Sequence, residues 1–398
     1  MRLNVPVDDP YGPNNLPYGV YSVPDRDPRC AVRYGDSVVD LALLLADDMF
    51  ATSTLNPFMA MGIDTWAAVR EEVRAALRGN VVNAAVHPIA DVEMHLPIAV
   101  ADYVDFYASE HHASNLGRIL RPGNPDPLTP NWKHLPIGYH GRSASIVVSG
   151  TNIVRPSGQR KGPGDDHPVF GPTSRLDIEA ELAFVVGTGN SIGIPIPVDQ
   201  AERHIFGVLL FNDWSARDIQ QWEYIPLGPN LGKSFACTVS PWIVPLLALD
   251  AARVPIPSQE PSVLPYLTLS DPWGLDVDFT VRWNGQVVSR PPYASMYWSP
   301  AQMLAHLTSN GAPTRTGDVF ASGTISGPSP GEQGSCIEMS HGGTEPMTVG
   351  GKMRTFLEDG DEIVLTASAP ARDGSRIGFG EARGRIIRST SSESSTSP

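Results

Sequence analysis

The sequence predicts a mainly β protein of the α+β class, and two observations support this. Glycine and proline, 37 and 38 of the 398 residues, are spread along the whole chain. So many chain breakers indicate frequent turns and exclude an all-helical bundle. Beyond residue 97, short apolar or alternating runs recur between Gly, Pro and Asp residues, which is the pattern of strands. At roughly 100–200 residues per domain, the length suggests two or three domains.

The N-terminal part of the chain predicts a small unit of strands followed by helix. The expected strands are Val20–Ser22, Ala31–Tyr34 and Val38–Leu45. A helix is expected over Asp64–Leu77, with Asp64 able to cap its start and Gly79 its end. Its apolar face would consist of Trp66, Val69, Val73 and Leu77. A strand-like run meets proline at Met94–Pro97, so the first domain is expected to span residues 1–96.

Residues 97–388 predict a larger β domain that is interrupted by one helix. The expected strands are Ser145–Val148, Ile178–Val186, Gly207–Phe211, Tyr266–Leu269, Val277–Trp283, Asp318–Ser322 and Glu362–Ala367. The helix begins at a capping box, Ser299–Gln302, with Pro300 at its first position, and continues through Leu307. The Ser-rich residues 389–398 have too little apolar content to pack and are expected to form a disordered tail.

The composition restricts partners and location. A net charge of −14 argues against nucleic acid and membrane as partners, because both need a basic surface. No stretch reaches the ~18 apolar residues of a membrane span, and no basic segment precedes an apolar run at the start, so no signal peptide is expected. The three cysteines, Cys30, Cys237 and Cys336, form no CxxC pair, which argues against disulfides and agrees with a cytoplasmic location.

Common catalytic signatures are absent from the sequence. It has no HExxH, EF-hand or P-loop pattern, no GxGxxG that opens a helix after a strand, and no GxSxG elbow. Nucleotide chemistry and an α/β-hydrolase serine mechanism therefore have no support. The candidate chemistry comes instead from three acidic segments.

The first acidic segment is the expected strand Asp177–Val186. Side chains alternate along a strand, so Asp177, Glu179 and Glu181 share one face and apolar side chains occupy the other. Carboxylates this close repel one another and are costly to bury unless a cation or a shared proton compensates. The segment is therefore either a solvated strand face or part of a cation site.

Two further segments contribute acids. Asp213 follows the apolar strand Val208–Phe211, where it either belongs to a site or caps the next segment. Asp102–His112 places acids, tyrosines and paired histidines in one loop, and a histidine there is either structural or a general base. Hard oxygen ligands select Mg²⁺ or Ca²⁺ over zinc or copper. The all-oxygen set consists of Asp105, Glu179, Glu181 and Asp213.

Other polar segments have either a surface or a binding role. Lys233 follows a Gly/Pro-rich turn and is either exposed or a buried cation directed at a developing oxyanion. The loop Ala321–Gly327 is either a plain turn or binds an anion through its hydroxyls and amides. Arg121 and the loop Gly138–Arg142 either bind a carboxylate or are surface features.

Taken together, these motifs resemble the fumarylacetoacetate hydrolase family. The resemblance extends from about residue 15 to 388, and its most specific part is the thirteen-residue run Asn212–Tyr224, NDWSARDIQQWEY, which is too long to arise by chance. It also includes Asp105–Tyr107 with His112, Glu179–Glu181, Gly232–Phe235, Ala321–Gly327 and Asn15–Val20.

The resemblance implies a small SH3-like N-terminal β domain, a large mixed β-sandwich roll, and a homodimer. It also implies hydrolysis of a carbon–carbon bond in 4-fumarylacetoacetate, a dicarboxylate β-diketone, to fumarate and acetoacetate. This is the last step of tyrosine and phenylalanine catabolism. A divalent cation, Mg²⁺ or Ca²⁺, would stabilise the enolate leaving group.

The family's site positions carry over to particular residues of this chain. The metal ligands would be Asp105, Glu179, Glu181 and Asp213. The general base would be His112, oriented by Glu338, and the oxyanion would be stabilised by Arg217, Gln220 and Lys233. The substrate would contact Tyr107, Arg121, Tyr139, Gln220, Tyr224 and Thr324. A second cation near Lys233 and Cys237 is left open, because Cys237 stands where animal relatives carry threonine.

Two other functions remain open from the sequence. The same kind of site would suit an acylpyruvate hydrolase, or a decarboxylase or isomerase of 2-oxo-3-enoic diacids, because the same kind of enolate forms. A non-catalytic β-rich binding module that uses the cation only structurally is the alternative of a different class.

Overall fold

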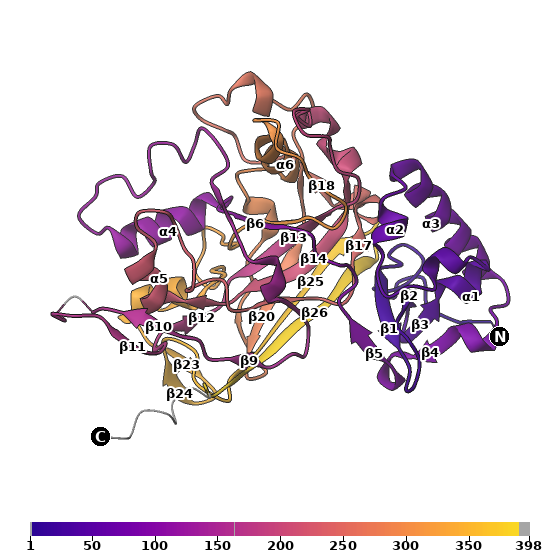
Figure 1. The fold of residues 1–398 in the computed structure, drawn as a ribbon, viewed down its shortest axis with the longest axis horizontal. Helices are drawn as coiled ribbons and strands as arrows, with labels where there is room; N and C mark the ends of the chain where they lie inside the picture. The colour runs from indigo at the N-terminus through magenta and orange to yellow at the C-terminus, as the bar shows by residue number, and fades with distance from the viewer. Residues whose placement is uncertain (1, 163, 390–398) are drawn as a thin grey trace.

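The protein is built mostly from strands, with a small N-terminal unit beside a larger body (Figure 1). This confirms the predicted fold class. The structure is a computed structural model that describes residues 2–162 and 164–389. Except for Ser389, the segment expected to be a disordered tail, 389–398, lies outside the described residues.

The N-terminal unit is an antiparallel five-stranded sheet in the order β4-β3-β2-β1-β5. Its strands are β1 (Tyr18–Ser22), β2 (Arg29–Tyr34), β3 (Ser37–Asp40), β4 (Val86–Pro88) and β5 (Glu93–His95). The helices α1 (Leu41–Leu45), α2 (Asn56–Met59) and α3 (Ile63–Arg78) accompany this sheet.

Two details of this unit differ from the sequence prediction. The expected strand Val38–Leu45 ends at Asp40, because the Asp40 side chain accepts a hydrogen bond from Leu43 N (2.8 Å) and caps α1. Asp64 does not cap α3. The helix begins one residue earlier, after Gly62, whose φ of 86° suits glycine. Gly79 ends α3 as predicted.

The larger body contains an eight-stranded sheet in the order β7-β6-β22-β13-β14-β16-β8, with β17 also paired to β14. Its strands are β6 (Tyr103–Phe106), β7 (Gly138–His140), β8 (Ile146–Val148), β13 (Ala180–Val186), β14 (Ile205–Asp213), β16 (Cys237–Val239), β17 (Val244–Pro245) and β22 (Val319–Ala321).

A second sheet of five strands follows the order β21-β20-β25-β26-β9. Its strands are β9 (Ile153–Val154), β20 (Asp278–Trp283), β21 (Gln286–Ser289), β25 (Glu362–Pro370) and β26 (Arg376–Ile387). The other strands form short pairs: β10 (Ser157–Arg160) with β11 (Val169–Pro172), β12 (Leu176–Asp177) with β15 (Ser215–Ala216), β18 (Arg253–Val254) with β19 (Gly274–Leu275), and β23 (Met347–Val349) with β24 (Lys352–Arg354).

Helices of the larger body confirm one prediction and correct two others. Helix α6 (Pro300–Thr308) has the predicted capping box, in which Ser299 Oγ accepts from Gln302 N and Gln302 Oε1 accepts from Ser299 N, both at 3.1 Å. The expected strand Tyr266–Leu269 is wrong. Pro265 starts a 3₁₀ turn there, Pro265–Leu267, and Leu267 is buried. The histidine segment is not a loop, because helix α4 (Glu110–Leu120) includes both histidines.

Strands β13 and β14 are buried on both faces. Leu182, Phe184 and Leu210 point into the core of the larger body, whereas Leu209 and Phe211 pack in the core shared with the N-terminal unit. In the shared core, the Phe206 ring lies edge-on to the Phe58 and Trp66 rings, with centroids 5.6 Å and 5.3 Å away. The strands that carry the acids are thus held from both sides.

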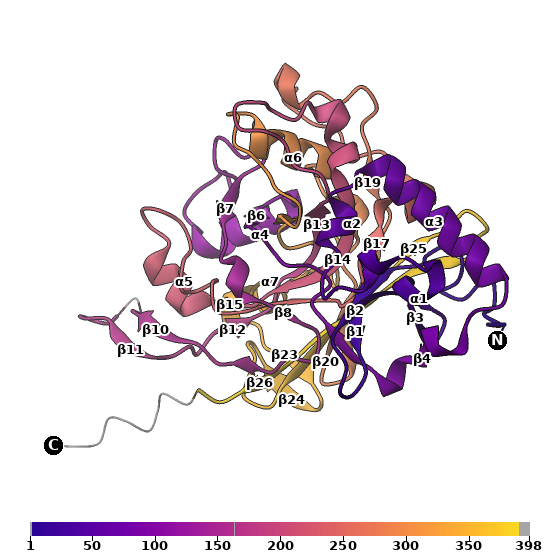
Figure 2. The same ribbon diagram turned by 45° about the vertical axis from the view of Figure 1, so that its right-hand side comes forward.

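The helices near the predicted site lie on the side of the body away from the N-terminal unit (Figure 2). They are α4, α5 (Arg217–Glu223) and α7 (Cys336–Met339). No helix among the described residues is sufficiently long and apolar to cross a membrane.

Candidate active site

Strand pairing brings the predicted acids to one edge of the eight-stranded sheet. Strand β6 runs parallel to β22, and β13 runs antiparallel to both β22 and β14. The ends of β6 and β14 and the start of β13 therefore meet. Asp105 lies near the end of β6, Asp213 is the last residue of β14, and Glu179 and Glu181 flank the first residue of β13.

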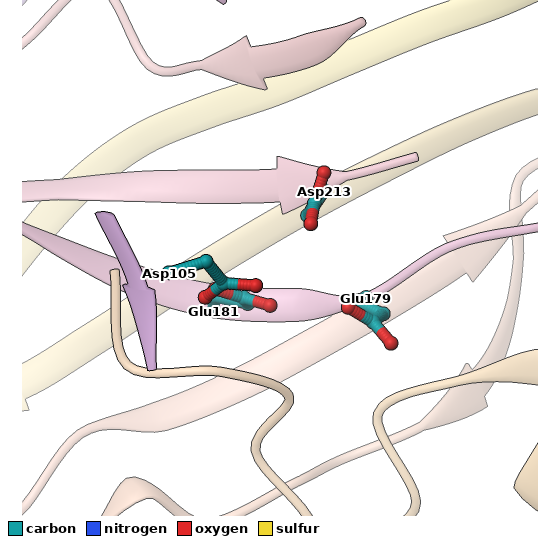
Figure 3. A group of neighbouring side chains, drawn as sticks. All are labelled: Asp105, Glu179, Glu181 and Asp213. Carbon is teal, nitrogen blue, oxygen red and sulfur yellow. The ribbon is translucent and has the colours of Figure 1, made fainter. Parts of the chain in front are cut away.

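The four acids form a compact buried cluster (Figure 3). One carboxylate oxygen from each lies within 4.8 Å of the others. The exposed fractions are 2% for Asp105, 5% for Glu179, and 0% for Glu181 and Asp213. The alternative of a solvated strand face is therefore excluded. Asp213 also ends a strand and does not cap α5, whose N-cap is Ala216.

Two buried cations hold one half of the cluster. Lys233 Nζ donates to Glu179 Oε2 and to Asp213 Oδ2, the latter at 2.8 Å, and Arg217 Nη2 lies 2.8 Å from Glu179 Oε1. Burial works to raise the pKa of Glu179, but Lys233 and Arg217 outweigh it and hold that pKa below its usual range. Lys233 is 5% exposed, so it is not a surface residue.

The other half of the cluster has two carboxylate oxygens without a partner. Among the described residues, nothing forms a hydrogen bond with the buried atoms Asp105 Oδ1 and Glu181 Oε1. Burial raises the pKa of both carboxyls well above the usual values. The neighbouring Asp213 raises the pKa of Asp105 further, and Asp105 in turn raises the pKa of Glu181. Buried carboxylate oxygens without donors are costly unless a cation satisfies them. The four oxygens and their charge fit a hard divalent ion.

The loop after β22 completes the wall beside Glu181. Gly323 N donates to Glu181 Oε2 (3.1 Å). Only glycine fits here, because φ is +74° and an added Cβ would lie 2.2 Å from Phe106 O. The next residue, Thr324, is 1% exposed, and its Oγ1 has no hydrogen-bond partner among residues 2–162 and 164–389. Its hydroxyl is therefore free to bind a ligand.

His112 and Glu338 form a buried pair next to the acids. His112 Nδ1 lies 2.7 Å from Glu338 Oε2, and His112 Nε2 lies 4.0 Å from Glu179 Oε1. Burial works to raise the pKa of Glu338, but His112 and hydrogen-bond donors lower it overall. An ionised Glu338 favours the tautomer that carries its proton on Nδ1, and in the neutral ring of that tautomer Nε2 is the proton acceptor, on the side of the acid cluster.

The predicted tyrosines differ in their contact with the cluster. Tyr139 OH donates to Asp213 Oδ2 (2.8 Å). The Tyr107 ring lies edge-on to the His112 ring, 5.4 Å between centroids. Burial and then Glu338 raise the pKa of Tyr107, and Arg121 is close enough to oppose them. Tyr224 is 38% exposed at the end of α5, and no hydrogen bond joins its side chain to the described cluster.

Of the remaining predicted residues, Gln220 contacts a buried cation, whereas Arg121 lies at the end of α4. Gln220 Oε1 accepts from Arg217 Nη1 (3.2 Å). The chain approaches Gln220 closely at Gly232, where a Cβ would lie 2.7 Å from Gln220 N and Cα, and this approach positions Lys233. Arg121 donates to Pro127 O (2.8 Å) at the end of α4.

Cys237 contacts the cluster as a donor. Its Sγ lies 3.2 Å from Asp213 Oδ1. Burial and then Asp213 raise the pKa of the thiol well above its usual value, so the sulfur stays protonated. A neutral thiol is a poor ligand for Mg²⁺ or Ca²⁺.

Several functional contacts were not foreseen from the sequence. Asp177, predicted only to share the acidic face, accepts from Arg217 Nε (2.8 Å) and from the first backbone N–H groups of α7. It thereby connects Arg217 to the helix that carries Glu338. Strand alternation was the signal for Asp177. The donors around Glu338, which are Asn115, Ser326 and Ser335, have no comparable local signal.

The β architecture and the buried acid cluster beside a His–Glu pair are the arrangement expected of a metal-assisted hydrolytic enzyme. Two protein-family models match the chain. The model described as "Fumarylacetoacetase N-terminal" matches residues 14–97, and the model described as "Fumarylacetoacetate (FAA) hydrolase C-terminal" matches residues 102–387. The chain belongs to the fumarylacetoacetate hydrolase family.

Individual relatives agree with this assignment. The chain is 45% identical to the fumarylacetoacetase of Homo sapiens and 43% identical to that of Arabidopsis thaliana, in each case covering 97% of this chain and 98% of the relative. A solved structure of fumarylacetoacetate hydrolase from Exiguobacterium antarcticum shares the fold, with a TM-score of 0.58 and 19% identity over 94% of this chain and 99% of the other.

Proposed function

We propose that this chain hydrolyses the carbon–carbon bond of 4-fumarylacetoacetate to fumarate and acetoacetate, as the last step of tyrosine and phenylalanine catabolism. The observation that carries the proposal is the buried cluster of four carboxylates beside the His112–Glu338 pair. Full-length similarity to proteins named fumarylacetoacetase supports the substrate.

Asp105, Glu179, Glu181 and Asp213 would hold one divalent cation, Mg²⁺ or Ca²⁺. When bound, the cation supplies a Lewis acid for the β-diketone oxygens and stabilises the negative charge that develops as the bond breaks. With Lys233 and Arg217, it offsets the charge of the four acids, so a dianionic substrate is not repelled. We propose no second cation on Cys237, because its thiol is neutral.

His112 is the proposed general base. Its Nε2 would take the proton from a water molecule that attacks the carbonyl carbon, while Glu338 holds Nδ1–H and stabilises the imidazolium that forms. Such general-base assistance accelerates reactions by about 10²–10⁴-fold.

Lys233, Arg217 and Gln220 are the proposed oxyanion donors. Lys233 carries three N–H donors, of which Glu179 and Asp213 engage two. One donor therefore remains for the substrate. Because Gln220 Oε1 accepts from Arg217, the N–H groups of the Gln220 amide are at the end that does not face Arg217. The proposed substrate contacts are Tyr107, Arg121, Tyr139, Gln220, Tyr224 and Thr324, and the unpartnered Thr324 hydroxyl supports the last of these.

A homodimer and a cytoplasmic location are also proposed, on the resemblance to the family. Light scattering on the purified protein tests the dimer. A molar mass of one chain at assay concentration would contradict it.

A spectrophotometric assay tests the activity. Metal-loaded protein should remove the diketone absorbance of fumarylacetoacetate, and chelation by EDTA should abolish this until Mg²⁺ or Ca²⁺ is restored. Acylpyruvates and 2-oxo-3-enoic diacids are the comparison substrates, and faster turnover of either would favour the alternative enzymes. Unchanged absorbance with all substrates would favour a non-catalytic module.

A further inference from the structure

Helix α4 presents a row of polar side chains that begins at the proposed base. Asn115 and Arg118 follow His112 at steps of three residues and therefore lie on the same side of the helix. Arg118 Nη1 donates to Asn115 Oδ1 (3.2 Å), and Asn115 Nδ2 donates to Glu338 Oε1 (2.9 Å). One helix thus contacts both oxygens of Glu338, through His112 at Oε2 and through Asn115 at Oε1.

We propose that Asn115 is a positioning residue for the His112–Glu338 pair, and that Arg118 sets the orientation of the Asn115 amide. The inference rests on the function proposed above, in which His112 is the base. It adds a residue that does not touch the substrate and acts only through Glu338.

The two neighbours of Asn115 determine which end of its amide faces Glu338. An asparagine side chain has an accepting end and a donating end that a half-turn exchanges. Arg118 can only donate, and an ionised Glu338 can only accept. One orientation satisfies both, so the NH₂ group faces the carboxylate. Without Arg118, the amide loses the partner that disfavours the reversed orientation.

Asn115 anchors the oxygen that has the fewest other donors. Glu338 Oε2 accepts from His112, from Ser335 Oγ (2.6 Å) and from Ser326 Oγ (3.0 Å). Oε1 accepts only from Asn115 and from the same Ser326 hydroxyl (2.9 Å) among the described residues. Loss of the Asn115 donor would let the carboxylate rotate away from Nδ1, and fewer His112 rings would then present an unprotonated Nε2.

The row can be altered without touching the acid cluster. A cavity of about 470 Å³ is lined by Asn115, Arg118 and Glu338, together with Met339 and His341, and by none of the four acids. Arg118 is exposed and Asn115 is half-buried. Substitutions at these two positions therefore leave the proposed metal ligands and their contacts in place.

The test compares substitutions that change hydrogen bonding and keep the branched shape of the side chain. Asn115→Leu keeps this shape and removes the donor, so kcat should fall about tenfold or more, the order of a hydrogen bond to a charged group. KM should change less than about twofold, because Asn115 does not contact the substrate. Asn115→Asp keeps the shape but places a second carboxylate against Glu338, so kcat should fall further.

Arg118 supplies a graded comparison. Arg118→Ala should lower kcat about threefold, and Arg118→Lys, which still donates, should restore most of it. Ser114→Ala is the matched control on the same helix, because no hydrogen bond is found for its side chain among the described residues. All variants should keep the Mg²⁺ affinity of the parent, and the Arg118 and Ser114 variants should also keep its melting temperature.

A spectroscopic readout separates this inference from the proposed function. Nitrogen NMR of the labelled His112 ring should show a protonated Nδ1 in the parent and a mixture of tautomers in Asn115→Leu. If the parent fails to hydrolyse fumarylacetoacetate, the proposed function fails, and the tautomer measurement alone decides the inference. An unchanged tautomer in Asn115→Leu overturns it, as does a kcat within twofold of the parent. An equal loss of kcat in the control Ser114→Ala would also overturn the inference.

Discussion

The four clustered acids form two unlike pairs. Glu179 and Asp213 accept from Lys233, and each has a further donor or cation beside it. Asp105 Oδ1 and Glu181 Oε1 have no hydrogen-bond partner in the described part of the chain. The first pair is already stabilised by the protein, so the second pair is the one that depends on a bound cation. This difference determines how removal of the metal affects stability.

Removal of the cation should make folding stability fall as pH rises. Burial raises the pKa of Asp105 and Glu181 above the ordinary values of 3.8 and 4.5, so the metal-free folded state binds more protons than the unfolded state. Their contribution is complete below those ordinary values and is lost as pH rises through the raised ones. The melting temperature of EDTA-treated protein between pH 5 and pH 8 measures this.

Two comparisons make the measurement specific. Saturating Mg²⁺ should flatten the decline, because the ion stabilises the charged carboxylates. Glu181→Gln should also flatten it in the metal-free protein, because one of the two titrating groups is gone. Equal slopes with and without the ion would contradict the assignment of the cation site.

His112→Ala should lower kcat by about 10²–10⁴-fold, the usual contribution of a general base. Its binding of the cation should be unchanged, because His112 Nε2 lies 4.0 Å from the nearest cluster oxygen. The control is His111→Ala, at the half-buried neighbouring position, with near-normal turnover expected. Steady-state kinetics with calorimetric metal titration checks both. Near-normal kcat in His112→Ala would remove the base assignment.

Helix α4 is the element that carries the proposed base, and its start is defined by a side chain. Ser109 Oγ accepts from His112 N (3.2 Å) and donates to Ser326 O (3.2 Å). The cap therefore fixes the backbone of His112 and also contacts the loop that supplies a donor to Glu338. The same end of α4 therefore both stabilises the helix and positions the proposed base.

Ser109→Ala should destabilise the protein by about 1 kcal/mol, as loss of an N-cap does. It should also lower kcat, because the first turn of α4 would hold His112 less firmly. Urea unfolding monitored by fluorescence gives the free energy change. Ser114→Ala, in the middle of the same helix, should change stability by less than about 0.5 kcal/mol. Equal stability of the two variants would show that the cap is unimportant.

At the scale of the whole molecule, the two parts of the chain share a core. Phe206 on β14 packs among Tyr18, Phe58 and Trp66 of the N-terminal unit. Strand β14 also ends in Asp213. The N-terminal unit thus packs against the strand that carries Asp213 to the site.

Phe206→Ala should cost about 3–5 kcal/mol, the range for truncating a buried phenylalanine. Because β14 belongs to the larger body, the whole chain should unfold in one transition at a lower temperature. Phe170→Ala is the control, since Phe170 is 73% exposed, and it should be nearly neutral. Calorimetry that showed loss of the N-terminal unit alone would contradict a shared core.

Local patterns succeeded where one short segment contained the whole signal. The capping box at Ser299 and the apolar face of α3 were predicted correctly, because both depend on residues a few positions apart. The predicted strand Tyr266–Leu269 was wrong because a short apolar run is compatible with a strand or a turn, and Pro265 favours the turn. Helix α4 was missed because polar residues and histidines obscure its periodicity.

Residue order along the chain is enough to establish the β-rich class, the shared face of Glu179 and Glu181, and membership of the family. Whether those acids meet Asp105 and Asp213, and whether they are buried, depends on the pairing of strands that are far apart in the chain. The same is true of His112 and Glu338, which are 226 residues apart. Periodicity reports only neighbours within a few residues, whereas desolvation and charge pairing arise once distant strands pack against one another.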